Sequence, residues 1–304
     1  MGVFEIGAAV EVFRASAIAA AYELGMVGAL AARSTLDELS AAIGIERGVH
    51  RVHALVAALV QEGVLVREED RIGLGEVPAR PEVVREGWGR LAEVIRANRP
   101  LPLDPDPRGY HAHLVRTGGE TARALAPILG GASLLDLGGG AGTYTAAVLD
   151  AHPAATAMLV DAPAVIPLAR AHLARFGDRV QLVAGDARTA PLGIGHGTAL
   201  LANVLHLHAP AACVELCAVA ARAVAPGGKV VVTDLDAATP EGVWFALNMA
   251  LYTDGGGVYS TSQIRAWMTA GGTGDLVEHR LAVAPAVVAV VGTRLDVPWP
   301  RHEQ

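Results

Sequence analysis

The chain has 304 residues, of which 52% are hydrophobic, 18% charged and 4% aromatic. This length and apolar content suffice to bury a large core and to form two folded units, which excludes a disordered chain. The formal net charge of −7 argues against nucleic acid or an anionic membrane as the main partner, because both require a basic surface. The sequence shows neither an apolar run of membrane-spanning length nor a secretion signal, so the expected location is the cytoplasm.

The first 80 residues are predicted to form a winged-helix domain. Helices are expected over 10–24, 36–43 and 49–62, followed by a hairpin with strands over 63–67 and 71–74. Winged helices often bind DNA, but seven basic and eleven acidic residues give this segment a net charge of −4. A DNA-binding domain should be basic, so a dimerisation domain and a homodimer are predicted, and a DNA-binding regulator is the weaker alternative.

Residues 81–130 are predicted to form a helical linker, with helices over 81–98 and 111–129 around a proline-rich stretch over 99–107. From 131 to 304, apolar strands alternate with helical segments, which predicts a Rossmann-like α/β domain with a doubly wound parallel sheet. The expected parallel strands cover 133–137, 156–160, 180–184, 198–203 and 229–234, and strands over 276–281 and 286–291 add a terminal antiparallel hairpin. The tail over 297–304 is expected to fray.

A glycine-rich turn follows the first of these strands. Its glycines, Gly138, Gly140 and Gly142, are spaced GxGxG, and Asp136 comes two residues before the first. A dinucleotide-binding fingerprint would need a glycine at Thr143 instead. The turn therefore favours S-adenosylmethionine over NAD as the cofactor.

Acidic residues mark the ends of the first three strands, at Asp136, Asp161 and Asp186. A carboxylate at the end of the second strand can accept hydrogen bonds from both ribose hydroxyls of a nucleoside cofactor. Each acid alone has an alternative interpretation as a helix cap or turn residue. Their shared placement at strand ends favours the cofactor site.

Five motifs together resemble the class I S-adenosylmethionine-dependent O-methyltransferases of the caffeic-acid and bacterial natural-product type. They are 135–142, 160–165, 179–180 with 185–186, 203–206 and 225–229. The resemblance covers nearly the whole chain and implies an N-terminal winged-helix dimerisation domain. It implies these cofactor-binding residues: Asp136, Gly138, Gly140, Asp161, Asp186, Ala187 and Asn203.

The resemblance also implies His206 as the general base, assisted by Asp234. Histidine suits this task because its side chain ordinarily titrates near neutral pH. The family's His-Asp-Trp setting is replaced here by His206-Leu207-His208, and the family's second acid is replaced by Gln263. These departures motivate an alternative on the same fold: C- or N-methylation, cyclisation of the cofactor or a non-methylating rearrangement.

The acceptor pocket implied by the resemblance is polar, and the chain has few aromatic residues to clamp a large planar ring system. A small, polar natural-product intermediate is therefore predicted as the substrate, with O-methylation as the reaction. The implied substrate-binding residues are Tyr110, His111, His113, His208, Trp244, Asn248, Met249 and Tyr252.

No metal is required for this reaction, although the sequence leaves two metal sites open as alternatives. One would join His111 and His113 to His206 and His208. The other would join the last two histidines to Cys213 and Cys217, the only cysteines of the chain. Those cysteines are four residues apart on an amphipathic helical stretch, so buried thiols are the simpler interpretation.

Overall fold

The computed structural model describes residues 6–102, 106–130 and 133–296. The predicted fraying tail and part of the predicted proline-rich stretch, residues 103–105, lie outside these ranges. The chain divides into two compact units. The N-terminal unit comprises residues 1–104, 206–209 and 237–258, and the sheet unit comprises 105–205, 210–236 and 259–304. The predicted domain limits at 80 and 130 remain predictions.

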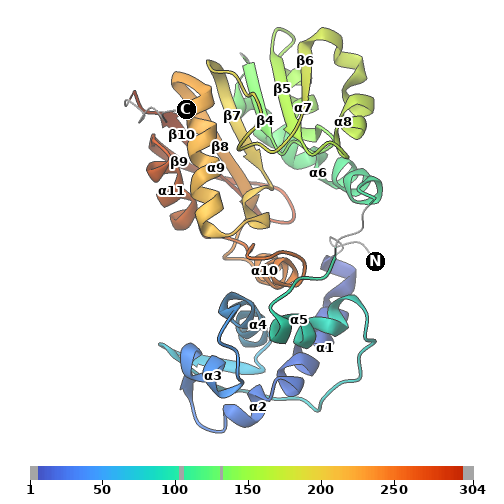
Figure 1. Cartoon of the computed structure of the whole chain (residues 1–304), viewed down its shortest axis with the longest axis vertical. Coiled ribbons are helices and arrows are strands. Elements are labelled where there is room, and N and C mark those ends of the chain that lie inside the picture. The colour runs from blue at the N-terminus through green and yellow to red at the C-terminus, as the bar shows by residue number, and fades with distance from the viewer. Residues whose placement is uncertain (1–5, 103–105, 131–132, 297–304) are drawn as a thin grey trace. The chain divides into compact units, whose positions relative to one another are not determined.

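The N-terminal unit combines helices with a small antiparallel sheet of order β1-β3-β2 (Figure 1). The helices and the hairpin predicted within residues 1–80 are present, with bounds that differ by a few residues. The elements are α1 (Ile6–Glu23), α2 (Met26–Ala29), β1 (Ser34–Thr35), α3 (Leu36–Ala42), α4 (Val49–Gln61), β2 (Leu65–Glu68), β3 (Arg71–Leu74), η1 (Gly87–Arg90), α5 (Leu91–Ala97) and α10 (Pro240–Tyr252).

The predicted helix over 81–98 is wrong in its first third. Residues 81–84 have no regular structure, and helical backbone begins only with η1 and continues into α5. A Cβ atom on Gly89 would lie 1.8 Å from the Val84 carbonyl oxygen. The chain therefore folds back tightly here, which a helix starting at Pro81 would not permit.

Helix α10 comes from the C-terminal half of the sequence but packs in the N-terminal unit. Its Trp244 lies in an aromatic cluster with Phe13 of α1 and Trp88 of η1, and the Phe13 and Trp88 rings stack with centroids 4.1 Å apart. The Leu101 N–H also donates to the Leu251 carbonyl at 2.9 Å. Helix α10 is thus part of the core of this unit.

A fully buried arginine ties α10 to α4. The Arg51 guanidinium donates through Nη1 to the Ala250 carbonyl and through Nε to Asn98 Oδ1 at 3.1 Å. Burial lowers the pKa of Arg51, and the nearby Asp254 carboxylate opposes this shift. Arg51 Nη2 is buried without a hydrogen-bond partner among the described residues.

We expect Arg51→Met to lower the free energy of unfolding by about 2–3 kcal/mol, because it leaves the buried Ala250 carbonyl unpaired. Relief of the buried charge offsets part of this cost, which keeps the expected loss in that range. Urea denaturation would measure it. Arg47→Met, at an exposed position, is the control and should shift stability by no more than about 0.5 kcal/mol. Equal midpoints for the two variants would contradict the prediction.

The sheet unit contains a seven-stranded sheet of order β6-β5-β4-β7-β8-β10-β9, with β4 to β8 parallel and the β9-β10 hairpin antiparallel. The predicted doubly wound sheet with a terminal hairpin is therefore confirmed. Its strands are β4 (Ser133–Leu137), β5 (Thr156–Asp161), β6 (Val180–Ala184), β7 (His196–Ala202), β8 (Val224–Leu235), β9 (Thr273–Leu281) and β10 (Val287–Arg294).

Helices cover both faces of this sheet (Figure 1). Helices α9 (Pro210–Ala223) and α11 (Thr261–Ala270) pack on the face that carries Leu135. Helices α6 (Arg108–Leu129), α7 (Thr143–Ala151) and α8 (Ile166–Leu173) pack on the face that carries Leu134. Alternate side chains of β4 thus enter two separate apolar cores, as expected for a sheet buried on both sides. The short helices η2 (Ala174–Arg179) and η3 (Leu205–Leu207) complete the helical elements of the described residues.

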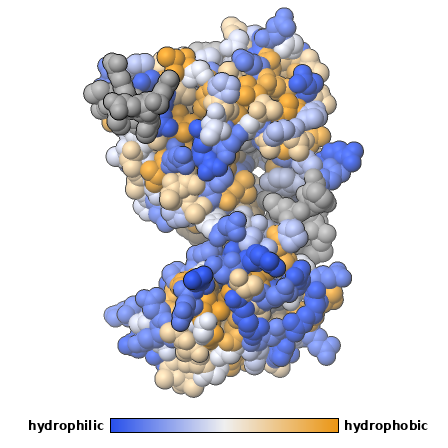
Figure 2. Space-filling model, in the orientation of Figure 1, coloured by the Kyte–Doolittle hydropathy of each residue, from blue (hydrophilic) through white to orange (hydrophobic). Residues whose placement is uncertain are grey.

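Hydrophobic residues on the face drawn in Figure 2 are interspersed with hydrophilic ones. Among the helices of the described residues, none is both long and apolar enough to cross a membrane.

Candidate functional site

The turn between β4 and α7 needs glycine, because its backbone conformation is left-handed and neighbouring side chains leave little room for a Cβ atom. Gly138 and Gly140 have φ angles of 70° and 59°, in the left-handed region that favours glycine. A Cβ atom on Gly138 would lie 2.7 Å from Val204 Cγ2, and one on Gly140 would lie 3.1 Å from His111 Nδ1. The turn therefore presents bare backbone at the carboxyl ends of the parallel strands.

Asp161, at the end of β5, is held against this turn. Its Oδ2 accepts the Gly140 N–H at 2.7 Å, and its Oδ1 accepts the Ala162 N–H at 2.7 Å. The Gly138 N–H donates to the Val160 carbonyl at 2.8 Å, which joins the turn to the same strand. Each carboxylate oxygen keeps acceptor capacity beyond these bonds, and the side chain is only partly buried.

Asp136 lies beneath the turn and is fully buried. Its Oδ2 accepts the Thr145 hydroxyl at 2.6 Å, whereas its Oδ1 has no hydrogen-bond partner among the described residues. Burial raises the pKa of Asp136 to about 6, although the hydrogen bond from Thr145 opposes the shift. Sequence reasoning missed Thr145, and its position in the first turn of α7, directly above Asp136, is the signal that could have found it.

This pKa predicts a specific pH dependence of stability. The folded protein retains the Asp136 proton up to about pH 6, whereas the unfolded chain loses it near 3.8, so stability falls as pH rises through this window. We expect Asp136→Asn to remove up to about 3 kcal/mol of this fall, at about 1.4 kcal/mol per pKa unit. The measurement is the difference in unfolding free energy between the two proteins across the window. A constant difference would contradict the assigned pKa.

Asp186 follows β6, and part of the hydrogen-bonding capacity of its carboxylate is used by a neighbouring residue. Its Oδ1 accepts the Arg188 backbone N–H at 2.8 Å and the Arg188 Nε–H at 2.9 Å. The adjacent Ala187 is half-buried against the core on the α9 face. The Gly185 N–H donates to the Asp161 carbonyl at 2.9 Å, so a backbone hydrogen bond joins the ends of β5 and β6.

Asn203 follows β7 in a left-handed conformation, with φ of 56°. Its Nδ2 donates to the Tyr144 hydroxyl at 3.1 Å, and its backbone N–H donates to the Thr233 carbonyl at 2.9 Å. Side chains other than glycine rarely adopt this backbone, and such positions cluster at functional sites. Asn203 is thereby fixed at the carboxyl edge of the sheet, just beyond β7 and outside the strand in which the sequence had placed it.

Asp234, the next-to-last residue of β8, is a buried carboxylate that influences the pKa values of three tyrosines. Burial raises the pKa of Tyr144 to about 12, and the Asp234 carboxylate adds to that shift. Burial also raises the pKa values of Tyr110 and Tyr259. The Asp234 carboxylate adds to the shift of Tyr110, whereas Cys213 and then Asp234 add to that of Tyr259. These side chains therefore stay protonated at neutral pH around the Asp234 carboxylate.

The histidines singled out in the sequence have different surroundings. His206 lies in η3, is 2% exposed, and meets the Phe245 ring edge-on with centroids 4.9 Å apart. His111 is buried in α6, and His113 Nδ1 lies 3.1 Å from Arg116 Nη2. His208 is partly buried. Within the described ranges, no group of three or more histidine, cysteine, aspartate or glutamate residues could hold a metal ion.

Four predicted substrate-binding residues share α10, in the N-terminal unit. Trp244, Asn248 and Met249 are buried, and Tyr252 is half-buried with its hydroxyl 3.7 Å from where a Cβ on Gly87 would lie. Trp244 belongs to the aromatic core cluster described above. Tyr110, His111 and His113 lie on α6, in the sheet unit.

Gln263 has a structural role at the start of α11. It forms a capping box with Ser260, in which the Ser260 hydroxyl accepts the Gln263 N–H and the Gln263 side chain accepts the Ser260 N–H. The pattern Ser-x-x-Gln is a sequence signature of this cap and could have identified the role. Cys213 and Cys217 are buried free thiols on α9.

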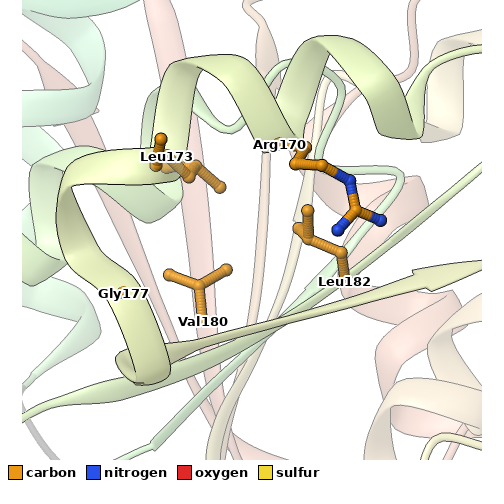
Figure 3. Close-up of a pocket in the computed structure, with 6 residues that line it drawn as sticks. Arg170, Leu173, Gly177, Val180 and Leu182 are labelled. Carbon is orange, nitrogen blue, oxygen red and sulfur yellow. The ribbon is translucent and has the colours of Figure 1, made fainter.

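A separate cavity of about 190 Å³ lies between α8, η2 and the edge strand β6 (Figure 3). Apolar side chains and the Arg170 side chain line it, with Arg170 at one side. It is lined by Arg170, Leu173, Ala174, Gly177, Val180 and Leu182. None of these was predicted as a site residue.

A glycine turn bonded to an acidic strand end, at the carboxyl edge of a doubly wound sheet, defines the class of enzymes that bind a nucleoside cofactor. Residues 117–273, just over half of the chain, match the family model of the O-methyltransferase domain. The chain belongs to this family and is an S-adenosylmethionine-dependent methyltransferase.

Individual relatives agree with this assignment. The chain is 27% identical to 3-hydroxy-5-methyl-1-naphthoate 3-O-methyltransferase of Streptomyces sahachiroi, over 93% of this chain and 92% of that one. An O-methyltransferase family 2 protein from Planctomyces limnophilus, solved in complex with apigenin, has a TM-score of 0.71 at 23% identity and covers 93% of both chains. Human N-acetylserotonin methyltransferase, solved with S-adenosylmethionine, has a TM-score of 0.59 at 20% identity, over 97% of this chain and 100% of that one. These solved structures share the fold.

Proposed function

We propose that this enzyme transfers a methyl group from S-adenosylmethionine to a hydroxyl oxygen of a small, polar natural-product intermediate. The observation that carries the proposal is the bond between Gly140 N–H and Asp161 Oδ2 at the carboxyl edge of the sheet, within a domain of the O-methyltransferase family. The naphthoate O-methyltransferase relative supports a hydroxylated acceptor. When bound, the cofactor supplies an electrophilic methyl group on a positively charged sulfur.

The residues at this edge fit the cofactor. Gly138 and Gly140 leave backbone where a Cβ would otherwise stand, and Asp161 retains acceptor capacity for two ribose hydroxyls. Asp186 and Ala187 are proposed to hold the adenine, and Asp136 and Asn203 are proposed as further cofactor-binding residues. The Asp186 carboxylate already accepts from Arg188, so the adenine would share it with that side chain.

His206 is proposed as the general base and Asp234 as the carboxylate that assists it. A base must have a fixed orientation to remove the acceptor proton, and burial of His206 against the Phe245 ring supplies that restraint. Asp234 adds a buried negative charge, which would stabilise an imidazolium. The acceptor residues are proposed to be Tyr110, His113, His208, Trp244, Asn248, Met249 and Tyr252.

The test uses purified enzyme, S-adenosylmethionine with a ¹³C-labelled methyl group, and a panel of hydroxybenzoates and hydroxynaphthoates. We expect S-adenosylhomocysteine to form only when an acceptor is present, and the label to appear as a methoxy carbon in the product NMR spectrum. A label on ring carbon or nitrogen would favour the alternative transfers. Release of methylthioadenosine, or acceptor conversion without cofactor consumption, would overturn methyl transfer.

The N-terminal unit is proposed to be a winged-helix dimerisation domain. Its helices followed by a β2-β3 hairpin and the acidic balance of residues 1–80 support this assignment over DNA binding. Light scattering after size exclusion should give twice the mass of 31.3 kDa. A monomer, or binding to DNA in a low-salt gel shift, would count against the proposal.

A further inference from the structure

We propose that His111 binds the cofactor, through a hydrogen bond between its Nδ1 and a polar group of S-adenosylmethionine that lies beside Gly140. The proposal assigns His111 to the cofactor rather than to the acceptor, to which the family resemblance assigned it. It rests on the proposed location of the cofactor at the glycine turn and Asp161.

The contact between His111 and the glycine turn carries this inference. A Cβ atom on Gly140 would lie 3.1 Å from His111 Nδ1 and 3.2 Å from Cε1. The edge of the imidazole that bears Nδ1 thus lies against the α-carbon of Gly140. The N–H of the same glycine is bonded to Asp161 Oδ2 at 2.7 Å, so the ring, the turn and the ribose-binding acid form one group.

The hydrogen-bonding state of the ring gives a second, independent observation. His111 is 8% exposed, and its Nδ1 is buried with no hydrogen-bond partner among the described residues. A buried polar atom without a partner costs about 1–3 kcal/mol and is rare in folded proteins. A polar ligand atom at the turn would satisfy it.

The charge state of the ring limits what it can bind. Burial lowers the pKa of His111, and the Asp161 carboxylate opposes the shift without being the larger cause. The imidazole is therefore neutral at neutral pH, and Nδ1 either accepts or donates one hydrogen bond according to the tautomer. As an acceptor it suits a ribose hydroxyl or the ammonium group of the cofactor, and as a donor it suits the carboxylate.

Three substitutions separate hydrogen bonding from packing. His111→Phe keeps an aromatic ring of similar shape but no nitrogen, His111→Asn keeps a polar atom near the position of Nδ1, and His111→Ala removes both. Calorimetry with S-adenosylhomocysteine should show affinity about 10-fold weaker for the Phe and Ala variants, with partial recovery for the Asn variant. The matched control is His196→Phe, because His196 bonds to the Leu192 carbonyl at the amino-terminal end of β7, and its affinity should equal that of the wild type.

Two further measurements make the outcome specific. The side-chain ¹⁵N resonance of His111 Nδ1 should shift when S-adenosylhomocysteine is added. Methylthioadenosine, which keeps the ribose but lacks the amino-acid end, identifies the group that is bound: equal losses with both ligands indicate the ribose, and a loss with S-adenosylhomocysteine alone indicates the amino-acid end.

If folded His111→Phe binds S-adenosylhomocysteine as tightly as the wild type and the His111 ¹⁵N resonance of the wild type does not shift, the role of His111 is overturned. Asp161→Ala still tests the cofactor site itself in that case. If the wild type binds neither ligand, the proposed function fails together with this inference.

Discussion

Replacing His206 with alanine is expected to lower kcat by about 10²–10⁴-fold, the usual contribution of a positioned general base. The affinity for S-adenosylhomocysteine should change little, because the proposed base acts on the acceptor hydroxyl and not on the cofactor. The buried imidazole is restrained by the edge-on Phe245 ring, so its loss removes an oriented proton acceptor. Single-turnover rates with a saturating acceptor would separate the chemical step from product release.

Asp234→Asn and the double variant extend this experiment. If Asp234 assists His206, the double variant should be scarcely slower than His206→Ala, because residues that act as a unit give non-additive losses. His279→Ala, on the edge strand β9, is the control and should retain wild-type kcat. A His206→Ala enzyme with wild-type kcat would exclude this residue as the base, and fully additive losses would separate the two residues.

The central strands of the sheet were largely predictable because they are buried on both faces. Such strands appear in the sequence as nearly continuous apolar runs bounded by glycine and acidic residues. β4 therefore has the bounds expected from the sequence alone, and β5 differs by one residue. The edge strand β6 also has the expected bounds, although its residues are exposed or half-buried. The glycine turn and Asp161 were found for a related reason, since their positions along the chain are fixed by the strand ends.

The segment before η1 shows where local pattern fails. Pro81 and the apolar pair Val83 and Val84 suggest a helix start, because proline is common in the first turn. The close approach of Gly89 to the Val84 carbonyl and the positive φ of 49° at Gly87 instead impose a tight reversal. A reversal of this kind depends on contacts across several residues, which helical periodicity does not report.

The least predictable features are contacts between distant parts of the sequence. Arg51 and Ala250 are separated by 199 positions, and nothing in the local sequence of α4 indicates that this arginine is fully buried. His111 and Gly140 likewise meet only because α6 packs beside α7 in the same core. The sequence therefore indicated the chemistry near the glycine turn. It did not indicate whether His111 contacts the cofactor or the acceptor.

Asp161→Ala is expected to weaken binding of S-adenosylhomocysteine by about 10²–10⁴-fold. The substitution removes the two proposed charge-assisted hydrogen bonds to the ribose hydroxyls, and each such bond contributes about 1.5–3 kcal/mol to the binding free energy. The substitution also removes the acceptor of the Gly140 N–H, which frees the turn to move. Calorimetry on the folded variant measures the loss directly.

Two variants decide between these two causes. Asp161→Asn keeps one side-chain oxygen that can accept the Gly140 N–H but removes the charge, so an intermediate loss indicates that both the ribose bonds and the closed turn contribute. Asp178→Ala, at an exposed position of η2 in the same unit, should bind as tightly as the wild type. If Asp161→Ala also binds as tightly, the ribose is not held at the end of β5, and the placement of the cofactor at the glycine turn is refuted, because the turn and this carboxylate are joined by a direct hydrogen bond.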